Sequence, residues 1–294
     1  MADDVSEGDV NESSVVTWHH GLIARWWANF NLDGPEIEFF RPYVESGQPA
    51  LDVACGSGRL LVPWVKRGLE VDGVDASADM IDACRAAASG VGRAPNLFVQ
   101  ATHLLDLPRK YGTIIMCGSL GLGVTREQDL EGLRRVRAHL LPKGQLALDC
   151  EVGEFDFDAW KAKGGARSAN DEPPTSEQRQ LGADGFLYAL RHRITALDVE
   201  AKSARRELQA WQWLGDELVA HETHALVVNI YSPAEIVALL EQAGFVNVRV
   251  VGGYHGKPPK GDEAFLVYLA TASPEYESSR RPGHDVTRGG VFVT

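Results

Sequence analysis

Short apolar runs alternate with helix-like patterns between residues 50 and 149, and this alternation limits the fold more than any other feature. The apolar runs cover 50–54, 70–74, 97–101, 113–117 and 145–149. Helical periodicity covers 60–67, 78–88 and 127–141. Strands separated by helices are joined by right-handed crossovers, which cover both faces of a mostly parallel sheet. The sequence therefore predicts an α/β fold with a doubly wound sheet.

A different pattern follows the fifth apolar run. Three segments of strand character cover 185–197, 206–214 and 217–230, and Gly215-Asp216 between the last two favours a tight hairpin turn. We expect an antiparallel β insertion within residues 151–231. A helix and two closing strands within 232–272 then complete the main sheet, because Ser232, Pro233 and Glu235 form a capping-box start.

The hairpin turn also predicts a register. It sets Trp213 opposite Leu218, Trp211 opposite Ala220 and Gln209 opposite Glu222, which makes one face aromatic with Glu222 and His224 at its edge. That face is either a substrate platform or a surface packed on the core or on a second copy of the chain. A homodimer through this insertion is therefore one expectation.

Both ends of the chain differ from the middle. Residues 1–17 hold five acidic side chains and no basic one, which is typical of a disordered tail and opposite to a signal peptide. Residues 18–48 are rich in aromatic side chains and predict a helical lid in which Trp18, Trp26 and Trp27 pack, with Trp27 or Arg25 able to reach a ligand. Residues 273–294 are polar and predict a flexible tail.

The charge balance argues against two classes of partner. The formal net charge is -12, from 41 acidic and 29 basic residues. Five of these negative charges lie in the first tail, so the remaining domain is only mildly acidic. Phosphate backbones and membrane surfaces are anionic and favour basic proteins. We expect neither nucleic acid nor a membrane as a partner, and no apolar run is long enough to span a bilayer.

The four cysteines, Cys55, Cys84, Cys117 and Cys150, contain no Cys-x-x-Cys pair. This spacing is typical neither of a zinc site nor of a secreted disulfide framework. The sequence thus predicts no metal and a reduced, cytoplasmic protein.

The most informative segment is the turn after the first apolar run, Ala50-Leu51-Asp52-Val53-Ala54-Cys55-Gly56-Ser57-Gly58-Arg59-Leu60. Gly56 and Gly58 allow the backbone to bend tightly and to approach a ligand, with the first amides of the next helix directed at it. Pro63 places the start of that helix near Arg59 or Leu60, because its missing N–H is harmless only in the first turn.

An acidic residue, Asp75, ends the second apolar run seventeen residues after Gly58. This position suits a carboxylate that accepts both hydroxyls of a ribose. A dinucleotide fold would also need a third loop glycine, where this chain has Leu61. S-adenosylmethionine is therefore the favoured cofactor.

The segment 51–149 resembles the class I S-adenosylmethionine-dependent methyltransferase family, whose fold is a Rossmann-like sheet. Residues 232–270 resemble the same family more loosely. The order of the glycine loop, Asp75, Gly118-Ser119 and a Leu-x-Pro-x-Gly turn at 140–144 carries the resemblance. It implies a cofactor-binding core at 49–150. It also implies that Asp52 helps to hold the methionine amino group and that Asp75 binds the ribose. The loop contacts assigned with them are Ala54, Cys55, Gly56, Gly58 and Ala76. At the position of Ala54 the family more often has Gly.

The resemblance extends to the rest of the cofactor. It implies that Met80 packs on the adenine and that Cys117 and Gly118 lie beside the methionine portion and the transferred methyl group. Thr102 and His103 stand near the adenine amino group, where the family usually has an aspartate. These residues complete the expected cofactor site.

The acceptor is the least defined part of the prediction. Parallel-sheet proteins bind ligands at the carboxyl ends of their strands, and the insertion lies on that side. We therefore expect a small-molecule O- or N-methyltransferase, with Glu151, Tyr231, Tyr254 and His255 as candidates to take a proton. A protein methyltransferase and a non-catalytic binding module on the same fold remain alternatives.

Overall fold

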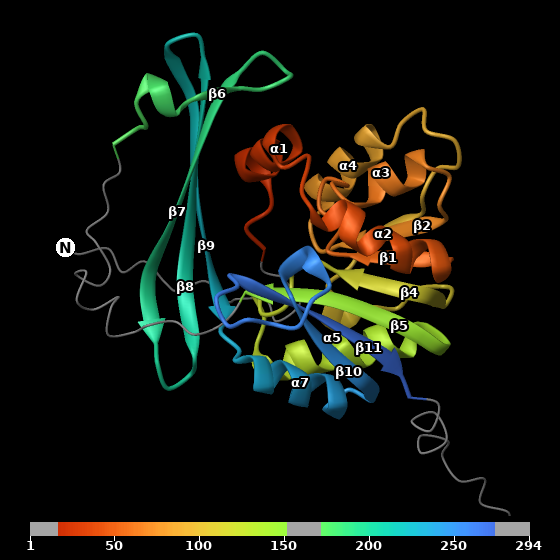
Figure 1. The fold of residues 1–294 in the computed structure, drawn as a ribbon. Helices are drawn as coiled ribbons and strands as arrows, with labels where there is room; N and C mark the ends of the chain where they lie inside the picture. The colour runs from red at the N-terminus through yellow and green to blue at the C-terminus, as the bar shows by residue number, and fades with distance from the viewer. Residues whose placement is uncertain (1–16, 152–171, 274–294) are drawn as a thin grey trace, which may run out of the picture.

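Two β-sheets of different kinds organise the computed structural model, which describes residues 17–151 and 172–273 (Figure 1). The larger sheet has seven strands and the smaller has four. Both predicted tails, apart from Thr17 and Ser273, and the start of the insertion lie outside the described residues. Of the described helices, none is long and apolar enough to cross a membrane.

The seven-stranded sheet is the predicted doubly wound sheet. Its strands are β1 Ala50–Val53, β2 Val71–Asp75, β3 Leu97–Val99, β4 Tyr111–Met116, β5 Leu140–Glu151, β10 Phe245–Gly252 and β11 Phe265–Ala272. They lie in the order β10-β11-β5-β4-β1-β2-β3. The five from β5 to β3 are parallel, whereas β11 runs antiparallel to both of its neighbours. The α/β prediction is thus confirmed.

Helices cover both faces of this sheet (Figure 1). One face carries α2 Glu36–Ser46, α3 Leu61–Lys66 and α4 Ala78–Ala87, and the other carries α5 Arg126–Ala138 and α7 Pro233–Gln242. Side-chain caps fix three helix starts, because Ser77, Thr125 and Ser232 each accept a bond from an amide in the first turn. Of these, α5 and α7 have full capping boxes.

The end of α5 differs from the prediction. The helix was expected to reach residue 141, but it ends at Ala138, and β5 already pairs with β4 at Leu140. Lys143 adopts a positive φ of 64° within this strand. The Leu-x-Pro-x-Gly turn therefore acts as an irregularity inside the start of β5, because apolar periodicity does not separate a helix end from a strand start.

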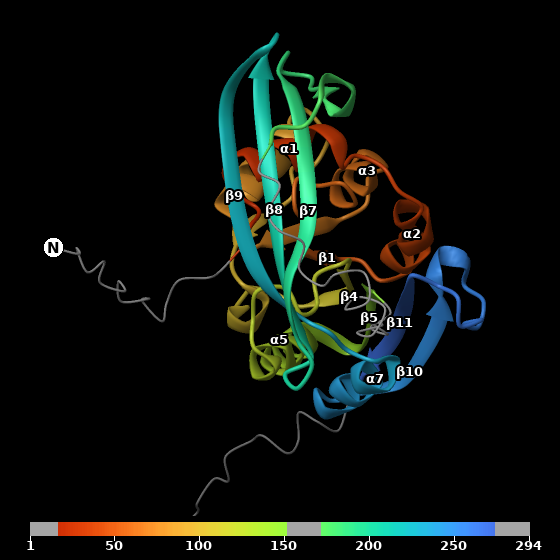
Figure 2. The same ribbon diagram turned by 90° about the vertical axis from the view of Figure 1, so that its left-hand side faces the viewer.

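The four-stranded sheet is the predicted antiparallel insertion. Its strands are β6 Gln180–Leu181, β7 Leu187–Asp198, β8 Ser203–Leu214 and β9 Glu217–Asn229. Helix α1, Gly21–Phe30, packs between this sheet and α4. Figure 2 turns the sheet to the viewer and shows its strands passing in front of α1.

The predicted hairpin register is wrong beyond its first pair. Trp213 faces Leu218 as expected, but Trp211 faces His221, and Glu222 faces Ala210. A β-bulge between Gln212 and Trp213 shifts the pairing by one residue, which transfers side chains to the other face. Glu222 and His224 of β9 therefore share a face with Ala210 and Leu208, which pack with α1, and not with the tryptophans. Trp211 and Trp213 pack on the opposite face and form no substrate platform.

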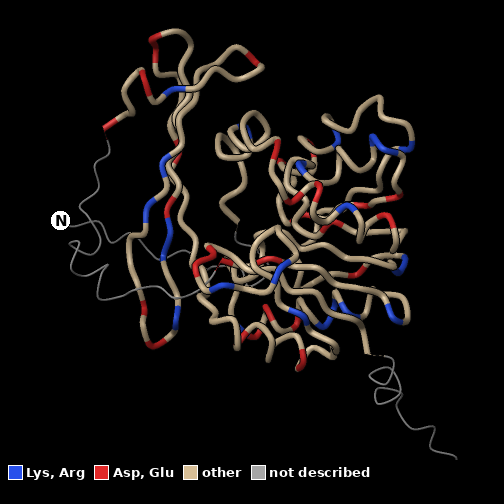
Figure 3. The backbone as a smooth tube through the Cα atoms, in the orientation of Figure 1, with Lys and Arg blue, Asp and Glu red and all other residues tan. Residues whose placement is uncertain are grey.

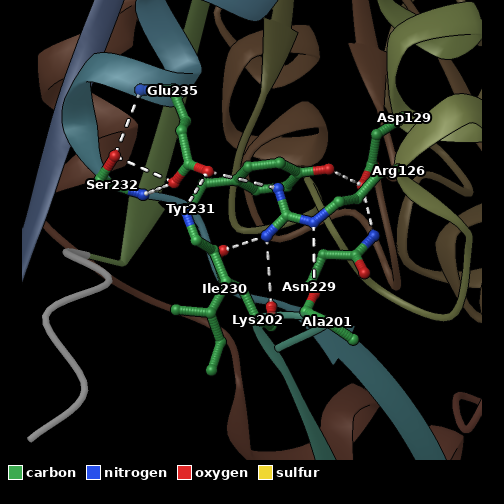
Figure 4. Close-up of polar contacts among 9 residues, drawn as sticks. All are labelled: Arg126, Asp129, Ala201, Lys202, Asn229, Ile230, Tyr231, Ser232 and Glu235. Carbon is green, nitrogen blue, oxygen red and sulfur yellow. Dashed lines mark hydrogen bonds and ion pairs between the residues drawn. The ribbon is translucent and has the colours of Figure 1, made fainter. Parts of the chain in front are cut away.

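The guanidinium of Arg126 connects the core to the smaller sheet, and Figure 4 draws its contacts. Arg126, at the start of α5, donates to the backbone carbonyls of Ala201 (3.4 Å), Lys202 (3.3 Å) and Ile230 (2.6 Å). Its guanidinium also lies 4.3 Å from the centre of the Tyr231 ring. It thereby holds the β7–β8 turn and the end of β9 against the core.

Asp129, one turn along α5, makes a second connection. Its carboxylate accepts hydrogen bonds from the Gly121 amide (2.9 Å), the Asn229 side chain (2.8 Å) and the Tyr231 hydroxyl (2.7 Å). Burial raises its pKa, although these hydrogen bonds act in the opposite direction. Asp129 therefore fixes the loop after β4 relative to the end of β9.

We predict that Arg126→Met lowers the free energy of unfolding by about 1.5–3 kcal/mol, because it removes charge-assisted bonds to strand-end carbonyls. Urea denaturation measures the change. Arg85→Met is the control, since that exposed side chain has one ion pair, with Asp82 on its own helix, and should change stability by no more than about 0.5 kcal/mol. Equal losses of unfolding free energy in the two variants would contradict the proposed connection through Arg126.

Candidate functional site

A cavity of about 490 Å³ lies at the carboxyl ends of β1, β2, β4 and β5. The β1–α3 turn and the loops after β2 and β3 form one half of its lining. Helix α1, with the chain just before it, and strands β8 and β9 of the smaller sheet form the other half. The cavity is therefore enclosed between the larger sheet, the lid helix and the insertion.

The two glycines of the β1–α3 turn have different functions. Both have positive φ, 54° at Gly56 and 91° at Gly58. A Cβ at Gly58 would lie 2.7 Å from Cγ2 of Val62 and 2.9 Å from Sγ of Cys84, so Gly58 permits helix packing and does not line the cavity. A Cβ at Gly56 would meet no atom within 4 Å and would project beside the cavity that Gly56 lines. Only Gly56 thus provides the open cradle that was expected of both.

Ala54 and Cys55 complete this turn and also line the cavity. Ala54 has a φ of 57°, a left-handed conformation that glycine adopts most easily. Cys55 is buried, its pKa is well raised first by its hydrogen bond with Cys84 and then by burial, and it packs as a small apolar side chain.

Asp75 lies at the end of β2 with its carboxylate held on both sides. One oxygen accepts from the Gly56 amide at 2.9 Å and the other from the Ser77 amide at 2.8 Å. The residue is 7% exposed, lines the cavity, and burial raises its pKa. Each oxygen keeps further acceptor capacity, which suits the two ribose hydroxyls that were expected here.

Asp52 lies one layer deeper than expected. It is 1% exposed and does not line the cavity. Among the described residues, neither of its carboxylate oxygens makes a hydrogen bond of good geometry, although the Leu61 amide acts to lower its pKa. Burial, and then the negative charge of Asp75, raise its pKa well above the ordinary value. An uncompensated buried acid beneath the glycine turn fits a cationic ligand above it.

The residues expected around the adenine gather at the β2 and β3 end of the cavity. Ala76, Met80, Thr102 and His103 all line it. His103 lies 3.4 Å from the Gln128 side chain, and burial, followed by the charge of Arg135, lowers its pKa. This end combines the apolar Ala76 and Met80 with the polar side chains of Gln100, Thr102, His103 and Gln128, which suits a nucleobase.

Cys117 and Gly118 line the opposite end together with Asp149, which sequence reasoning missed. Asp149 accepts from the Gly118 amide (2.5 Å), the Tyr254 hydroxyl (2.5 Å) and Cys117 Sγ (3.0 Å). Burial and then the charge of Asp149 raise the pKa of Cys117, so its thiol stays protonated. An acid at the carboxyl end of the apolar run 145–149 was the available signal.

The four residues predicted as candidates to take a proton have different surroundings. Tyr254 does not line the cavity, and its hydroxyl donates to Asp149. Glu151 lines the cavity and pairs with Arg206 at 2.7 Å. Tyr231 also lines it, but its hydroxyl donates to Asp129, and burial raises its pKa. His255 is exposed in the short η3 helix, Gly253–His255, and does not line the cavity. The structure therefore brings Glu151 and Tyr231 to the cavity but not His255.

The lid approaches the cavity through Trp18, His19, Trp27 and Asn31, whereas Arg25 does not line it. His19 Nε2 accepts from the Trp18 indole N–H at 3.1 Å, which requires a neutral ring. Burial, and then the charge of His20, lower the pKa of His19 to about 4.

The amides that begin α1 bind acids from two units. The Gly21 amide donates to Asp79 of α4 at 2.7 Å, and the Leu22 amide donates to Glu222 of β9 at 2.8 Å. The Ser77 hydroxyl also donates to the carbonyl of His19. Helix α1 is thus bonded to both walls of the cavity.

The comparisons with known proteins bear on the same residues. A family model described as "Methyltransferase domain" matches residues 50–144, which hold the strands, the glycine turn and Asp75. This stretch is therefore similar to a methyltransferase domain. The predicted resemblance is confirmed, and S-adenosylmethionine as the cofactor agrees with it.

One curated protein matches part of the chain. It is YqeM of Bacillus subtilis (strain 168), a methyltransferase by name, and it is 28% identical over 114 residues. The alignment covers 36% of this chain and 45% of the relative. This chain therefore matches less than half the length of that protein.

Two solved structures share the fold over more of the chain. An S-adenosylmethionine-dependent methyltransferase from Clostridium acetobutylicum ATCC 824 aligns with a TM-score of 0.61, 16% identity, and coverage of 81% of this chain and 92% of its own. The sugar N-methyltransferase KedS8 from Streptoalloteichus sp ATCC 53650 aligns with a TM-score of 0.60 and 18% identity over 93% of this chain and 99% of its own. The fold thus extends beyond the methyltransferase domain to the insertion.

In residues 17–151 and 172–273, no group of three histidine, cysteine or acidic side chains is placed to hold an ion.

We predict that Gly56→Ala weakens binding of S-adenosylmethionine by at least about tenfold, because its new methyl group occupies the cradle. Isothermal titration calorimetry measures the affinity. Gly68→Ala is the matched control: Gly68 also has positive φ (81°) with no atom within 4 Å, and it does not line the cavity. Both variants should lose about 1–2 kcal/mol of stability through backbone strain. Unchanged binding by Gly56→Ala would exclude this cradle.

We also predict a pH dependence from His19. Its pKa is lowered from 6.5 to about 4 on folding, so the stability gained from the neutral ring is present above pH 6.5 and is lost as the pH falls toward 4. The loss amounts to about 3 kcal/mol at most. His19→Gln should remove this part of the pH dependence of urea unfolding, whereas His255→Gln, at an exposed position, should retain it. The same pH profile in His19→Gln and the unmutated protein would contradict the assignment.

Proposed function

We propose that this chain is an S-adenosylmethionine-dependent methyltransferase that methylates an oxygen or nitrogen atom of a small molecule. The observation that carries the proposal is the single cavity, in which the cofactor-type turn and Asp75 face the insertion sheet across one enclosed space. Enclosure by α1 favours a small acceptor over a protein side chain. The sugar N-methyltransferase among the structural neighbours supports the same class of acceptor.

The cofactor half of the site would be held by residues already described. Asp75 would accept the ribose hydroxyls, Met80 and Thr102 would contact the adenine, and Gly56 would allow the turn to approach the methionine portion. Cys117 and Gly118 would border the methyl group. When bound, S-adenosylmethionine supplies a methyl group on a positively charged sulfur, and the buried acids Asp52 and Asp75 favour that charge.

The chain's own contribution to the reaction is mainly position and exclusion of water. Holding two aligned reactants in one site lowers the activation barrier by about 7–11 kcal/mol at best, because the loss of their translational and rotational freedom has already occurred on binding. The wall formed by Trp18, Leu226 and Val228 is apolar and excludes water from the acceptor side. A neutral amine acceptor would need no base before methyl transfer.

A protonated acceptor would need a base, and Glu151 is the one we propose among the four original candidates. Its carboxylate lines the cavity and is 70% exposed, so a proton taken there can pass to water. The Tyr231 hydroxyl is held by Asp129 and acts as a positioning group, because its raised pKa disfavours the phenolate. His255 has no part in this proposal.

Two accompanying expectations remain proposals. The four cysteines are free thiols in the structure, which supports a reducing, cytoplasmic location. A homodimer through the insertion stays a prediction that gel filtration can examine.

We predict that Asp75→Ala weakens S-adenosylmethionine binding by about 10- to 100-fold, as expected for lost hydrogen bonds to a charged group. Calorimetry with the intact chain measures this. Asp106→Ala, at an exposed position outside the cavity, is the control and should bind like the unmutated protein. No binding by the unmutated protein would refute the cofactor assignment.

Mass spectrometry of a metabolite panel incubated with S-adenosylmethionine then separates the alternatives. A methylated small molecule supports the proposal. Methylation of peptides alone would identify a protein methyltransferase, and binding without any methylated product would identify a non-catalytic binding module.

A further inference from the structure

The insertion sheet contributes one cation to the lining of the cavity within the described residues, and that cation is Arg206. It lies on β8, between Ile194 of β7 and Leu226 of β9 in the strand register. Its side chain is 16% exposed. A guanidinium thus stands beside apolar neighbours in the part of the cavity opposite the glycine turn.

The hydrogen-bonding capacity of Arg206 is largely unused. A guanidinium has five N–H donors. Among the described residues Arg206 has one partner, Glu151, whose Oε2 lies 2.7 Å from Nη2. Its Nε is buried without an acceptor. Because a buried charged donor without a partner is costly, this guanidinium favours an additional acceptor atom inside the cavity.

Glu151 is a partner that a ligand can replace. Its side chain is 70% exposed, against 16% for Arg206. Water can therefore solvate the released carboxylate, whereas the guanidinium stays enclosed. An anionic ligand in the cavity would gain the same charge pairing and could also reach the free Nε.

We propose that Arg206 binds an anionic group of the acceptor, so that the molecule methylated here carries a carboxylate or a phosphate besides its nucleophile. The proposal rests on the proposed function, because it requires the acceptor to occupy the sheet side of the cavity. The planar fork of arginine matches both anions with two parallel bonds. Acidic and basic residues are mixed along β7 and β8 in Figure 3, so the attraction is local to Arg206.

The other acids of the cavity do not reverse this preference. Asp129 and Asp149 each already accept three hydrogen bonds from neutral groups, which occupy most of their acceptor capacity. Asp75, which keeps acceptor capacity, belongs to the glycine-turn side, where the proposed function assigns it to the ribose. A cationic acceptor would instead pair with Glu151. The charge of the preferred ligand therefore tells which residue binds it: an anion would bind Arg206, and a cation would bind Glu151.

Three probes that share one phenyl ring test this sign: phenyl phosphate, phenylacetate and phenethylamine. Each is titrated into the full chain saturated with S-adenosylhomocysteine, at constant ionic strength. Tryptophan fluorescence reports binding, because Trp18 and Trp27 line the cavity. We expect both anions to bind more tightly than the amine, and the tighter anion identifies phosphate or carboxylate as the favoured group.

Arg206→Met should weaken anion binding by about 10- to 100-fold, as expected for lost charge-assisted bonds. Arg206→Lys keeps the charge without the fork and should have an intermediate effect. Arg205→Met is the matched control, because Arg205 is the neighbouring arginine on β8, is exposed and does not line the cavity. Glu151→Gln should strengthen anion binding, since it removes the competing carboxylate.

The outcomes separate this proposal from the proposed function. Failure of S-adenosylhomocysteine to bind the unmutated protein would refute the proposed function. If it binds, three results overturn the anion assignment alone: no binding of either anion, equal anion binding in Arg206→Met and the unmutated protein, or tighter binding of phenethylamine that Glu151→Gln abolishes. A lower melting temperature of Arg206→Met with unchanged anion binding would show that the ion pair only braces the sheet.

Discussion

The contact between the two sheets determines whether the cavity exists. Their strands belong to separate hydrogen-bonded sheets, so backbone pairing alone does not fix the distance between them. Arg126 binds carbonyls at strand ends, and Asp129 ties Asn229 and Tyr231 to the loop after β4. Both side chains come from the first turn of α5, whose capping box fixes its start. The geometry of the acceptor wall therefore depends on one helix terminus of the core.

A second constraint is the concentration of buried acids at the carboxyl edge of the larger sheet. Asp75 and Asp149 accept bonds from backbone amides, thiol or hydroxyl groups, and Asp52 makes no hydrogen bond of good geometry within the described residues. No cation in these contacts offsets their charge, so burial raises the pKa of both Asp52 and Asp75. A positively charged ligand would lower both pKa values again. The edge is thus more compatible with a sulfonium than with a pyrophosphate.

Sequence reasoning succeeded where local patterns determine the structure. The glycine turn, Asp75 and the start of α7 depend on residues close to one another in the chain, and the structure places them as expected. It failed where a single extra residue or a contact between distant parts of the chain determines the position of a side chain. The bulge at Gln212 and Trp213 leaves no compositional signal, yet it places Glu222 and His224 on the face opposite the two tryptophans.

The acceptor side shows the same limit. Asp129 could have been noticed as an acid on the apolar stripe of α5, but its partners are up to 102 residues away in the chain. Arg206 meets Glu151 across 55 residues, a pairing that requires the relative position of the two sheets. His255 was expected at the site because its loop follows a core strand, but loop length and direction cannot be read from strand periodicity.

The start of α1 links these units in a further way. A helix begins with backbone N–H groups that have no acceptor within the helix, and its N-terminus carries partial positive charge. In α1, no side-chain cap satisfies these groups; Asp79 from the core and Glu222 from the insertion do so. The first turn of α1 is therefore held by contacts with both the core and the insertion. If the core and the insertion separate, one of these two amides loses its acceptor. The stability of the first turn of α1 therefore depends on the contact between the core and the insertion.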